Sequence, residues 1–288
     1  MDENFRLFGS CCPEGLRRNK TTRVIPRKGR TEDMILAIDI GNTNIVIGCI
    51  EGEKVNFVER VSTDLSKTEL EYVVEFKTLF DLYQIGLADI TGSIISSVVP
   101  PLNNIMKSSL EKMLHKAPLV VGPGVKTGLN ILMDNPGQLG SDLVVNAVAG
   151  LHYYGEPIIM IDMGTATTIS VVDKKRNYIG GMILPGVKVS LDSLVNRTSQ
   201  LPRISLEAPR KVIGTNTIDC MKSGIVMGQA ACLDGMIERI HEELGYQAPV
   251  VATGGLSASI VPHCKKEIIC DNELTLKGLG LIYHKNVE

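Results

Sequence analysis

Two short polar segments of the sequence share one pattern, and both could hold a phosphate group. Residues 38–44 read IDIGNTN and residues 161–167 read IDMGTAT, and each follows an apolar stretch. Glycine lets a main chain approach an anion closely, and the neighbouring N–H and hydroxyl groups can donate hydrogen bonds to it. Asp39 and Asp162 could hold a hydrated Mg²⁺ or a monovalent cation beside those phosphates. One such segment is explained as well by a tight turn with a local Asx hydrogen bond, but two copies favour phosphate binding.

A third carboxylate, Asp142, stands at the expected start of a helix. The apolar residues that follow it recur with helical spacing, at Leu143, Val144, Ala147, Val148 and Leu151. An aspartate in this position is either a simple N-cap or a proton acceptor. The positive end of the helix dipole favours the ionised carboxylate, which predicts an unusually weak base. Phosphoryl transfer tolerates a weak base, because positioning and charge neutralisation supply most of its acceleration.

Several common catalytic motifs are absent from the sequence. It contains no Gly-x-x-x-x-Gly-Lys-Ser/Thr and no Gly-x-Gly-x-x-Gly that opens a helix after a strand, so P-loop, protein-kinase and Rossmann folds lose their main support. The five histidines show no metal-ligand spacing. The seven cysteines form no zinc-finger pair, and their odd number suits free thiols in a reducing compartment. A catalytic cysteine is the alternative, although none stands in a nucleophile motif.

The elements that must position these residues can be read from residue 34 onward. Runs rich in Ile and Val alternate there with helical segments, as is typical of an α/β protein. The runs at 35–40 and 45–50 flank the first polar segment and predict a β-hairpin, which the second polar segment repeats. A third glycine cluster at 253–255 follows an expected strand at 250–252 and precedes an expected helix. The remaining expected elements are helices at 70–82, 102–115 and 218–244 and a strand at 94–99.

Length and composition fit two modest lobes of a globular protein. The chain has 288 residues, 44% of them hydrophobic and 22% charged, and its net charge of -2 argues against a nucleic-acid partner. No apolar run approaches the roughly 18 residues that span a bilayer, and the N-terminus lacks the apolar core of a signal peptide. We therefore expect a cytoplasmic protein with no membrane partner. The duplicated segments predict one lobe at 34–150 and a second at 151–288, with a ligand between them.

Residues 1–33 differ from the rest of the chain. Arginines and lysines crowd together there, and the apolar periodicity is lost. We expect a disordered extension, or an upstream start with Met34 as the true first residue. Targeting or anion binding by the basic cluster is the alternative.

The paired segments and the late Gly-Gly resemble the actin-like ATPase superfamily, whose two duplicated, ribonuclease H-like lobes hold phosphates in a nucleotide cleft. Within it, residues 34–285 resemble type III pantothenate kinases. Five motifs in the family's order carry the resemblance: DIGNTN at 39–44, GSD at 140–142, IDMGTATT at 161–168, GGMILPG at 180–186 and TGG at 253–255. The resemblance implies an enzyme that phosphorylates pantothenate from ATP, the first step of coenzyme A biosynthesis. It also implies a homodimer.

The resemblance assigns roles residue by residue. Asp142 matches the catalytic base, and Asp162 matches the ligand of a monovalent cation, K⁺ or NH₄⁺, which acts beside Mg²⁺ and ATP. Thr253 and Gly254 match positions near the adenosine. The matches to the ATP- and phosphate-binding set are Asp39, Ile40, Gly41, Asn42, Thr43, Asn44, Ile45, Val46 and Thr165. The matches to the pantothenate-binding set are Gly140, Ser141, Asp142, Leu143 and Thr217.

One position departs from the family pattern, which is commonly Gly-Ala-Asp-Arg. This chain has Leu143 in place of the arginine that could meet the carboxylate of the substrate. Lys188 and Arg197 are candidate replacements, and a solvated surface charge is the alternative for each.

Two other functions compete with the kinase. The first is a non-catalytic nucleotide-binding regulator, because the same family resembles an accessory factor linked to transcription; the presence of Asp39, Asp142 and Asp162 disfavours it. The second is a kinase of the same fold that acts on a sugar or acetate, which the motifs at 140–142 and 180–186 disfavour.

Overall fold

The computed structural model describes residues 33–287 of the chain, which belong to one compact unit. The basic extension expected at 1–33 therefore lies outside the described residues except for Asp33, and so do Cys11 and Cys12.

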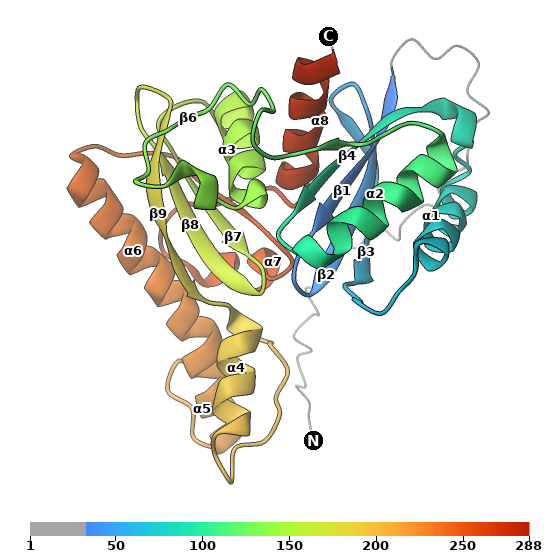
Figure 1. Cartoon of the computed structure of the whole chain (residues 1–288). Helices are drawn as coiled ribbons and strands as arrows, with labels where there is room; N and C mark the ends of the chain where they lie inside the picture. Colours follow the sequence, from blue (N-terminus) through green and yellow to red (C-terminus); the bar gives the residue numbers. More distant parts are fainter. Residues whose placement is uncertain (1–32, 288) are drawn as a thin grey trace, which may run out of the picture. The chain divides into compact units, whose positions relative to one another are not determined.

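The first half of the described chain forms a five-stranded sheet (Figure 1). Three strands make an antiparallel meander, and two more are added in parallel on the far side of β1. Helices α1 (Glu69–Tyr83) and α2 (Pro100–Leu114) cover one face. In spatial order the strands are β3 (Lys54–Ser62), β2 (Asn44–Glu51), β1 (Met34–Ile40), β4 (Ile90–Ser97) and β5 (Leu119–Val120).

The second half repeats this arrangement in a six-stranded sheet. Strands β7, β8 and β9 form the antiparallel meander, and β10 and β11 are parallel additions beside β7. The duplication of fold predicted from the two polar segments is therefore confirmed. The strands in order are β11 (Ile269–Cys270), β10 (Val250–Thr253), β7 (Ile158–Met163), β8 (Ala166–Val172), β9 (Asn177–Pro185) and β6 (Asn130–Ile131).

Alternation along β1 and β7 decides which way the two repeated aspartates face. Side chains of a strand point to opposite faces in turn. Ile38 and Ile40 enter the core under α1 and α2, whereas Ile35 and Ala37 pack on the other face beside α8. Asp39 has the same parity as Ile35 and Ala37, so it points toward α8. The same argument in β7 directs Asp162 toward α3, because Ile158 and Met160 pack on that face.

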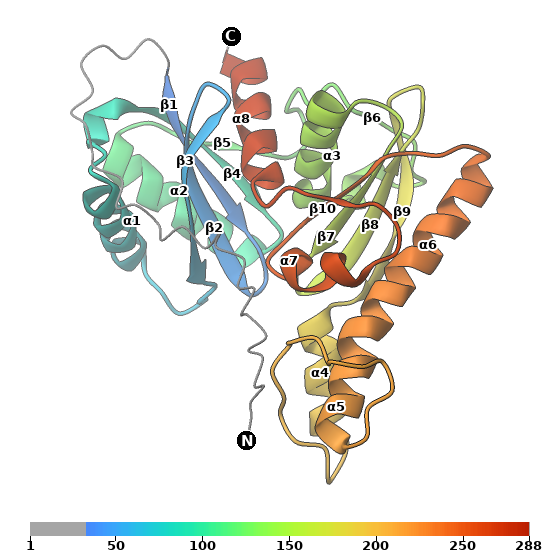
Figure 2. The same cartoon turned by 180° about the vertical axis from the view of Figure 1, so that it is seen from behind.

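Two helices, α3 (Ser141–Tyr154) and α8 (Leu274–Val287), lie side by side between the sheets (Figures 1 and 2). They approach closely at Gly278, where an added Cβ would stand 2.3 Å from the carbonyl oxygen of Val145. Helix α8 comes from the end of the chain but packs on β1, β2 and β4 of the first sheet. The two sheets therefore face a shared pair of helices.

Most of the remaining helices lie around the second sheet, and one short helix precedes β4 of the first sheet. Helix α5 (Thr217–Lys222), a π-helical turn (Ser223–Met227) and α6 (Gly228–Leu244) follow one another without a break, as the expected helix at 218–244 required. Helix α4 (Val187–Asn196) pairs with α5 in a projection beside α6 (Figure 1). Short helices are η1 (Leu87–Asp89), η2 (Pro136–Gln138), α7 (Ser257–Ile260) and η4 (Val261–His263). Within residues 33–287 no helix is both long enough and apolar enough to cross a bilayer.

The strand expected at 94–99 begins four residues earlier and ends at Ser97. Gly92 and Ser93 look like loop residues, yet they continue the parallel register with β1. An added Cβ at Gly92 would stand 1.8 Å from the Tyr283 hydroxyl oxygen, so α8 needs the small residue there. The helix expected after the cluster at 253–255 is only the four-residue α7.

The close approach of α3 and α8 predicts a large difference between two glycines of one helix. Gly278→Ala should destabilise the protein by about 1–3 kcal/mol, because the methyl group meets a backbone oxygen. Gly280→Ala is the matched control, since its methyl group meets only the Ile50 side chain at 3.3 Å. Urea unfolding of both variants measures the difference, and equal stabilities would contradict the packing described.

Candidate functional site

The two glycine turns of the sequence repeat lie in contact with each other. The Oγ1 atoms of Thr43 and Thr165 are 2.7 Å apart, although the residues come from different sheets. Both side chains are exposed. In the first turn Gly41 N–H donates to the Asn44 carbonyl at 3.0 Å, and in the second Gly164 N–H donates to the Ala166 carbonyl at 3.1 Å. The second turn is thus one residue shorter than the first, and Thr165 lies opposite Thr43.

Neighbouring segments fix the shape of each turn. The Thr63 hydroxyl donates to the Gly41 carbonyl at 2.6 Å, and the Thr63 N–H donates to the Thr43 carbonyl at 3.0 Å. Gly186 lies against the second turn so closely that an added Cβ would stand 2.1 Å from the Thr165 carbonyl oxygen. The glycine motif at 180–186 therefore has a structural reason, since a side chain at Gly186 would displace the second turn.

Three carboxylates, Asp39, Asp142 and Asp162, gather behind the turns, and we call them the aspartate cluster. Burial, and after it the charges of Asp142 and Asp162, raise the pKa of Asp39 to about 7 against the opposing effect of a hydrogen bond from Ser96. Burial and the charge of Asp142 raise the pKa of Asp162 to about 6. Like charges in a desolvated place disfavour ionisation, so the cluster attracts protons or cations.

Asp142 occupies the second position of α3, and its carboxylate turns back toward the start of the helix. An added Cβ on Gly140 would stand 2.4 Å from Asp142 Oδ1, so a larger residue there would push the carboxylate out of this position. Burial raises the pKa of Asp142, although hydrogen bonds from the Leu143 and Asp142 N–H groups lower it in part. The expectation of an unusually weak base is therefore wrong. Desolvation outweighs the helix terminus, which makes this aspartate a stronger proton acceptor than predicted.

Ser141 fastens the start of α3 to the first sheet. Its hydroxyl lies 3.0 Å from the Ser96 hydroxyl, accepts from the Ser97 N–H at 3.0 Å and lies 3.0 Å from the Ser97 carbonyl. Ser96 also hydrogen-bonds to Asp39. Ser141 therefore links α3 to the strand beside Asp39.

Asn146 fastens α3 to the second sheet, and sequence reasoning missed it. Its Nδ2 donates to Asp162 Oδ2 at 3.0 Å, and its Oδ1 accepts from the Thr275 hydroxyl of α8 at 2.8 Å. The side chain is buried. A signal was present in the sequence, because Asn146 follows Asp142 by four residues and so shares its helix face. This bond lowers the pKa of Asp162 against the effect of burial.

The other residues predicted to bind ATP or pantothenate differ in how exposed their side chains are. Ile40 and Ile45 are in the core, so only their main chain is available to a ligand. Val46 and Leu143 are half-buried. Thr253 is buried at the end of β10, level with Asp162 in the parallel register.

Three further predicted residues lie on or next to α4 and α5. Thr217 is exposed at the start of α5 in the projection, and no hydrogen bond links it to α3. Lys188 and Arg197 are exposed on and just beyond α4 in the same projection. No hydrogen bond or ion pair joins Lys188 or Arg197 to α3 among the described residues, so a replacement for the arginine missing at Leu143 stays a prediction.

The aspartate cluster does not form a complete metal site by itself. Among the described residues, no group of three or more His, Cys, Asp or Glu side chains is arranged to hold an ion. The raised pKa values of Asp39 and Asp162 nevertheless indicate excess negative charge. A cation bound there fits the electrostatics and would take further ligands from phosphate oxygens and water, as Mg²⁺ commonly does.

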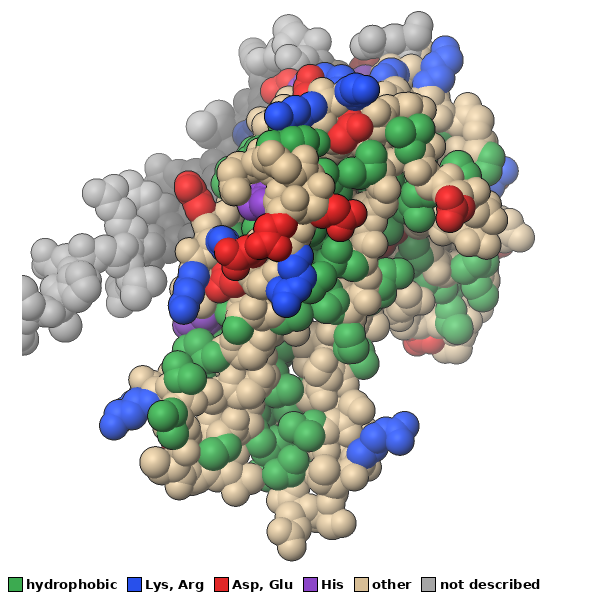
Figure 3. Space-filling model, turned by 90° about the vertical axis from the view of Figure 1, so that its left-hand side faces the viewer, with side chains coloured by type: hydrophobic (Ala, Val, Ile, Leu, Met, Phe, Trp, Pro, Cys, Tyr) green, Lys and Arg blue, Asp and Glu red, His purple; other side chains and the backbone are tan. Residues whose placement is uncertain are grey.

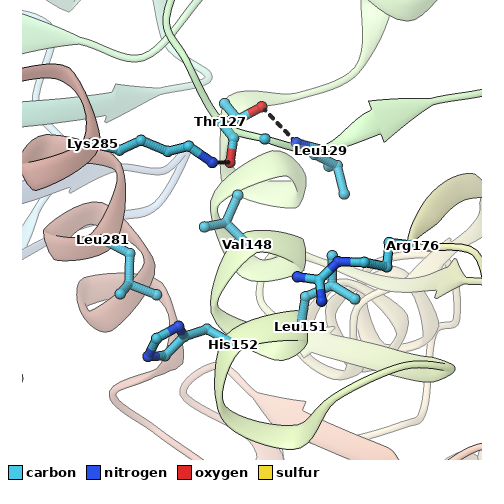
Figure 4. Close-up of a pocket in the computed structure, with 9 residues that line it drawn as sticks. Thr127, Leu129, Val148, Leu151, His152, Arg176, Leu281 and Lys285 are labelled. Carbon is cyan, nitrogen blue, oxygen red and sulfur yellow. Dashed lines mark hydrogen bonds between the residues drawn. The ribbon is translucent and has the colours of Figure 1, made fainter.

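A cavity of about 180 Å³ lies near the other end of α3 (Figure 4). Its basic side chains are already paired. Lys285 Nζ donates to the Thr127 carbonyl at 3.3 Å, Arg176 lies 3.2 Å from a Glu156 carboxylate oxygen, and His152 lies 3.6 Å from Glu53. Each basic side chain of the cavity is therefore already engaged by a carbonyl or carboxylate oxygen, and the cavity contains none of the predicted site residues.

Comparison with known proteins identifies close relatives of the whole described region. A family model described as type III pantothenate kinase matches residues 35–239. A protein called type III pantothenate kinase from Halalkalibacterium halodurans is 45% identical over 254 residues, which cover 88% of this chain and 100% of the relative. One of the same name from Brevibacillus brevis is 47% identical over 253 residues, which cover 88% of this chain and 99% of the relative.

Two solved structures share the fold. One is described as a conserved putative Baf family transcriptional activator from Campylobacter jejuni, with a TM-score of 0.55, 18% identity, and coverage of 87% of this chain and 98% of that one. The other is component A of the (R)-2-hydroxyglutaryl-CoA dehydratase of Acidaminococcus fermentans, with a TM-score of 0.55, 13% identity, and coverage of 89% and 100%. At these identities the likeness shows the two-lobed actin-like fold alone.

The raised pKa values predict that the ligand-free protein loses stability as pH rises from about 4 through about 7. An aspartate whose folded pKa exceeds its unfolded pKa binds more protons when folded, so deprotonation favours unfolding. Asp39→Asn should therefore stabilise the ligand-free protein at pH 8 by about 1–4 kcal/mol and flatten the pH dependence. Urea unfolding from pH 5 to 8 in EDTA measures both. The exposed Asp81→Asn is the control, and a wild-type slope in Asp39→Asn would contradict the prediction.

Proposed function

The chain belongs to the type III pantothenate kinase family and phosphorylates pantothenate from ATP, and we propose that the reaction takes place at the aspartate cluster and the two turns in front of it. The observation that carries this proposal is the contact between Thr43 and Thr165. Two duplicated turns, one from each sheet, meet there with exposed hydroxyl groups. A nucleotide can reach both turns only at this junction.

The phosphates of ATP would lie between the turns and separate the two threonines. Asn42, Thr43 and Thr165 are exposed and offer N–H and hydroxyl donors. The Thr43 and Thr165 hydroxyls hydrogen-bond to each other in the ligand-free protein, and a phosphate oxygen between them would instead accept a hydrogen bond from each. Thr253 and Gly254 follow β10 next to Asp162, and we assign them to the adenosine side.

Asp142 would accept the proton of the pantothenate hydroxyl. The hydroxyl oxygen forms a bond to the terminal phosphorus, the bond from that phosphorus to the bridging oxygen breaks, and the proton passes to the carboxylate. The raised pKa of Asp142 improves it as an acceptor near neutral pH. Ser141 and Asn146 hold its helix to both sheets, so its position relative to the two turns is fixed.

Cations complete this site. When bound, Mg²⁺ and a monovalent cation, K⁺ or NH₄⁺, would neutralise the phosphate oxygens and the aspartates. Asp162 is the proposed ligand of the monovalent ion. Asp39 faces the same space from the first sheet and is available to the hydrated Mg²⁺.

The pantothenate side of the site begins at the start of α3. Gly140, Ser141, Asp142 and Leu143 are the proposed contacts there. The Ser141 hydroxyl is already hydrogen-bonded to Ser97 of the first sheet, so Ser141 would contact the substrate through its main chain. ATP and pantothenate as substrates suit an enzyme of the cytoplasm.

The competing functions lack comparable support. A regulator without catalysis would not need three desolvated carboxylates, whose mutual repulsion opposes folding. The Campylobacter jejuni structure described as a putative activator shares the fold at 18% identity and does not bear on activity. The relatives at 45% and 47% identity are called pantothenate kinases, which disfavours a sugar or acetate as acceptor.

We further propose that two copies associate through the projection formed by α4 and α5. Hydrophobic side chains gather on it (Figure 3). Its exposed apolar residues are Val189, Leu194, Val212, Ile213 and Ile218, and Ile183 of β9 lies next to them in sequence. Isolated exposed apolar residues are ordinary, but a gathered set indicates an interface. In such a homodimer Thr217, which begins α5, would stand at the interface.

Asp142→Asn should lower kcat by about 10²–10⁴-fold with pantothenate, because the carboxamide cannot accept the proton. Melting temperature and affinity for a non-hydrolysable ATP analogue should stay near wild type. Release of ADP, measured with pantothenate, glucose and acetate and with or without K⁺, checks the substrate and the cation together. Turnover by the wild type with glucose alone would reject the substrate, and full activity of Asp142→Asn would reject the base.

Ile213→Asp should convert a dimer to a monomer, because a charge replaces a side chain that is 82% exposed in one copy and buried between two. Sedimentation velocity measures the mass. Leu82→Asp on α1 is the control, since Leu82 is 67% exposed but stands outside the projection. A monomeric wild type would contradict the proposed assembly.

A further inference from the structure

Arg60 lies in the same row of the first sheet as Asp39. In the antiparallel register Asp39 pairs with Val46, and Val46 pairs with Arg60. Side chains of directly paired residues stand on the same face of a sheet. Val46 and Val58 are half-buried and pack against the core cluster that includes residues of α8, so the face of β3 that carries Val58 and Arg60 looks toward the inner helices. Arg60 therefore shares with Asp39 the face that looks toward the second sheet.

The charge of Arg60 reaches the second sheet. It lowers the pKa of Asp162, whose value burial and Asp142 raise to about 6. Asp162 belongs to β7, so a guanidinium on β3 acts across the junction of the two sheets. Arg60 is the cation of the described residues that acts on Asp162 in this way.

Arg60 nevertheless has no partner of its own. It is exposed, and it forms no ion pair or hydrogen bond with the described residues. The aspartate cluster stands nearby, yet none of its carboxylates engages the guanidinium directly. An arginine held at such a place with its donors free is arranged for an anionic ligand, since guanidinium groups bind phosphate oxygens in a bidentate manner.

We propose that Arg60 binds the triphosphate of ATP and stabilises the charge on the phosphoryl group during transfer. This inference rests on the proposed function, because it adds a residue to the same site. In phosphoryl transfer an arginine at the terminal phosphate supplies positive charge that substrate and metal ions leave unbalanced. Neither the repeated turns nor the five motifs include Arg60, which is why sequence reasoning did not select it.

The carboxylate of pantothenate is the other anion that Arg60 could meet, and the sheet register disfavours it. Val46, the neighbour of Arg60, ends the segment assigned to the phosphates. The pantothenate segment instead begins α3 beside β4, on the opposite side of β1 from β2 and β3. Arg60 is thus separated from Ser141 by two intervening strands and lies next to the phosphate segment.

The test compares Arg60→Gln and Arg60→Lys with Lys54→Gln in the full chain. Lys54 is an exposed cation at the far end of the same strand, about 20 Å away for six residues of extended chain. Titration calorimetry with the non-hydrolysable analogue AMPPNP and with AMP measures nucleotide binding, and ADP release measures kcat and the KM values. Melting temperature verifies that each variant folds.

Arg60→Gln should weaken AMPPNP by about 10–100-fold while AMP affinity stays within about two-fold, because AMP lacks the phosphates that the guanidinium meets. Its kcat should fall by about 10²–10³-fold, with partial rescue in Arg60→Lys, and Lys54→Gln should match wild type. Unchanged AMPPNP affinity and kcat would overturn the proposal. So would a higher KM for pantothenate alone, which would assign Arg60 to the substrate carboxylate. A wild type that binds AMPPNP but leaves pantothenate unphosphorylated would reject the proposed substrate and leave the binding comparison decisive for Arg60.

Discussion

The structure depends on one electrostatic constraint, the partial burial of three carboxylates where two sheets face each other. Asp39 and Asp162 come from equivalent strands of the duplicated lobes, and Asp142 comes from the helix between them. Desolvation raises the pKa of all three, and the charge of Asp142 raises the pKa values of Asp39 and Asp162 as well. Without a bound cation this arrangement opposes folding. It favours the binding of cations and of the phosphate groups that bind with them. Repulsion between the aspartates therefore destabilises the ligand-free protein. Functional sites commonly lower the stability of the fold in this way.

Helix α3 gives this cluster its geometry. Its first residue, Ser141, hydrogen-bonds to Ser97 of β4 in the first sheet. Asn146, five residues later, hydrogen-bonds to Asp162 of the second sheet. Asn146 also accepts from Thr275 of α8, the helix that returns from the end of the chain to cover the first sheet. Asp142 is therefore held between two lobes by bonds to each. A relative movement of the sheets would act directly on its position.

The two lobes are copies in topology but not in detail. The first turn has one residue more than the second, and within residues 33–287 only the second turn has glycines from other segments pressed against it. Gly186 and Gly254 both stand within reach of residues 162–165, where an added Cβ would meet backbone or carboxylate atoms. The first turn is instead held by hydrogen bonds from Thr63. One turn is thus shaped by close packing and the other by polar contacts, so the two present different surfaces to one ligand.

The sequence by itself determined the duplicated architecture, because strand alternation and the repeated glycine turns are local patterns that can be read from the order of the residues. It also determined the family, since five motifs occur in order. The tertiary structure alone decided which residues meet: Asn146 with Asp162, Ser141 with Ser97, and Arg60 on the face of Asp39. The sequence predicted a weak base at Asp142 because a helix terminus is a local feature, whereas the desolvation that raises its pKa depends on chain segments far away in sequence. The desolvation and the electrostatic environment of the aspartates depend on many residues that are distant in sequence, so no short sequence pattern reveals them.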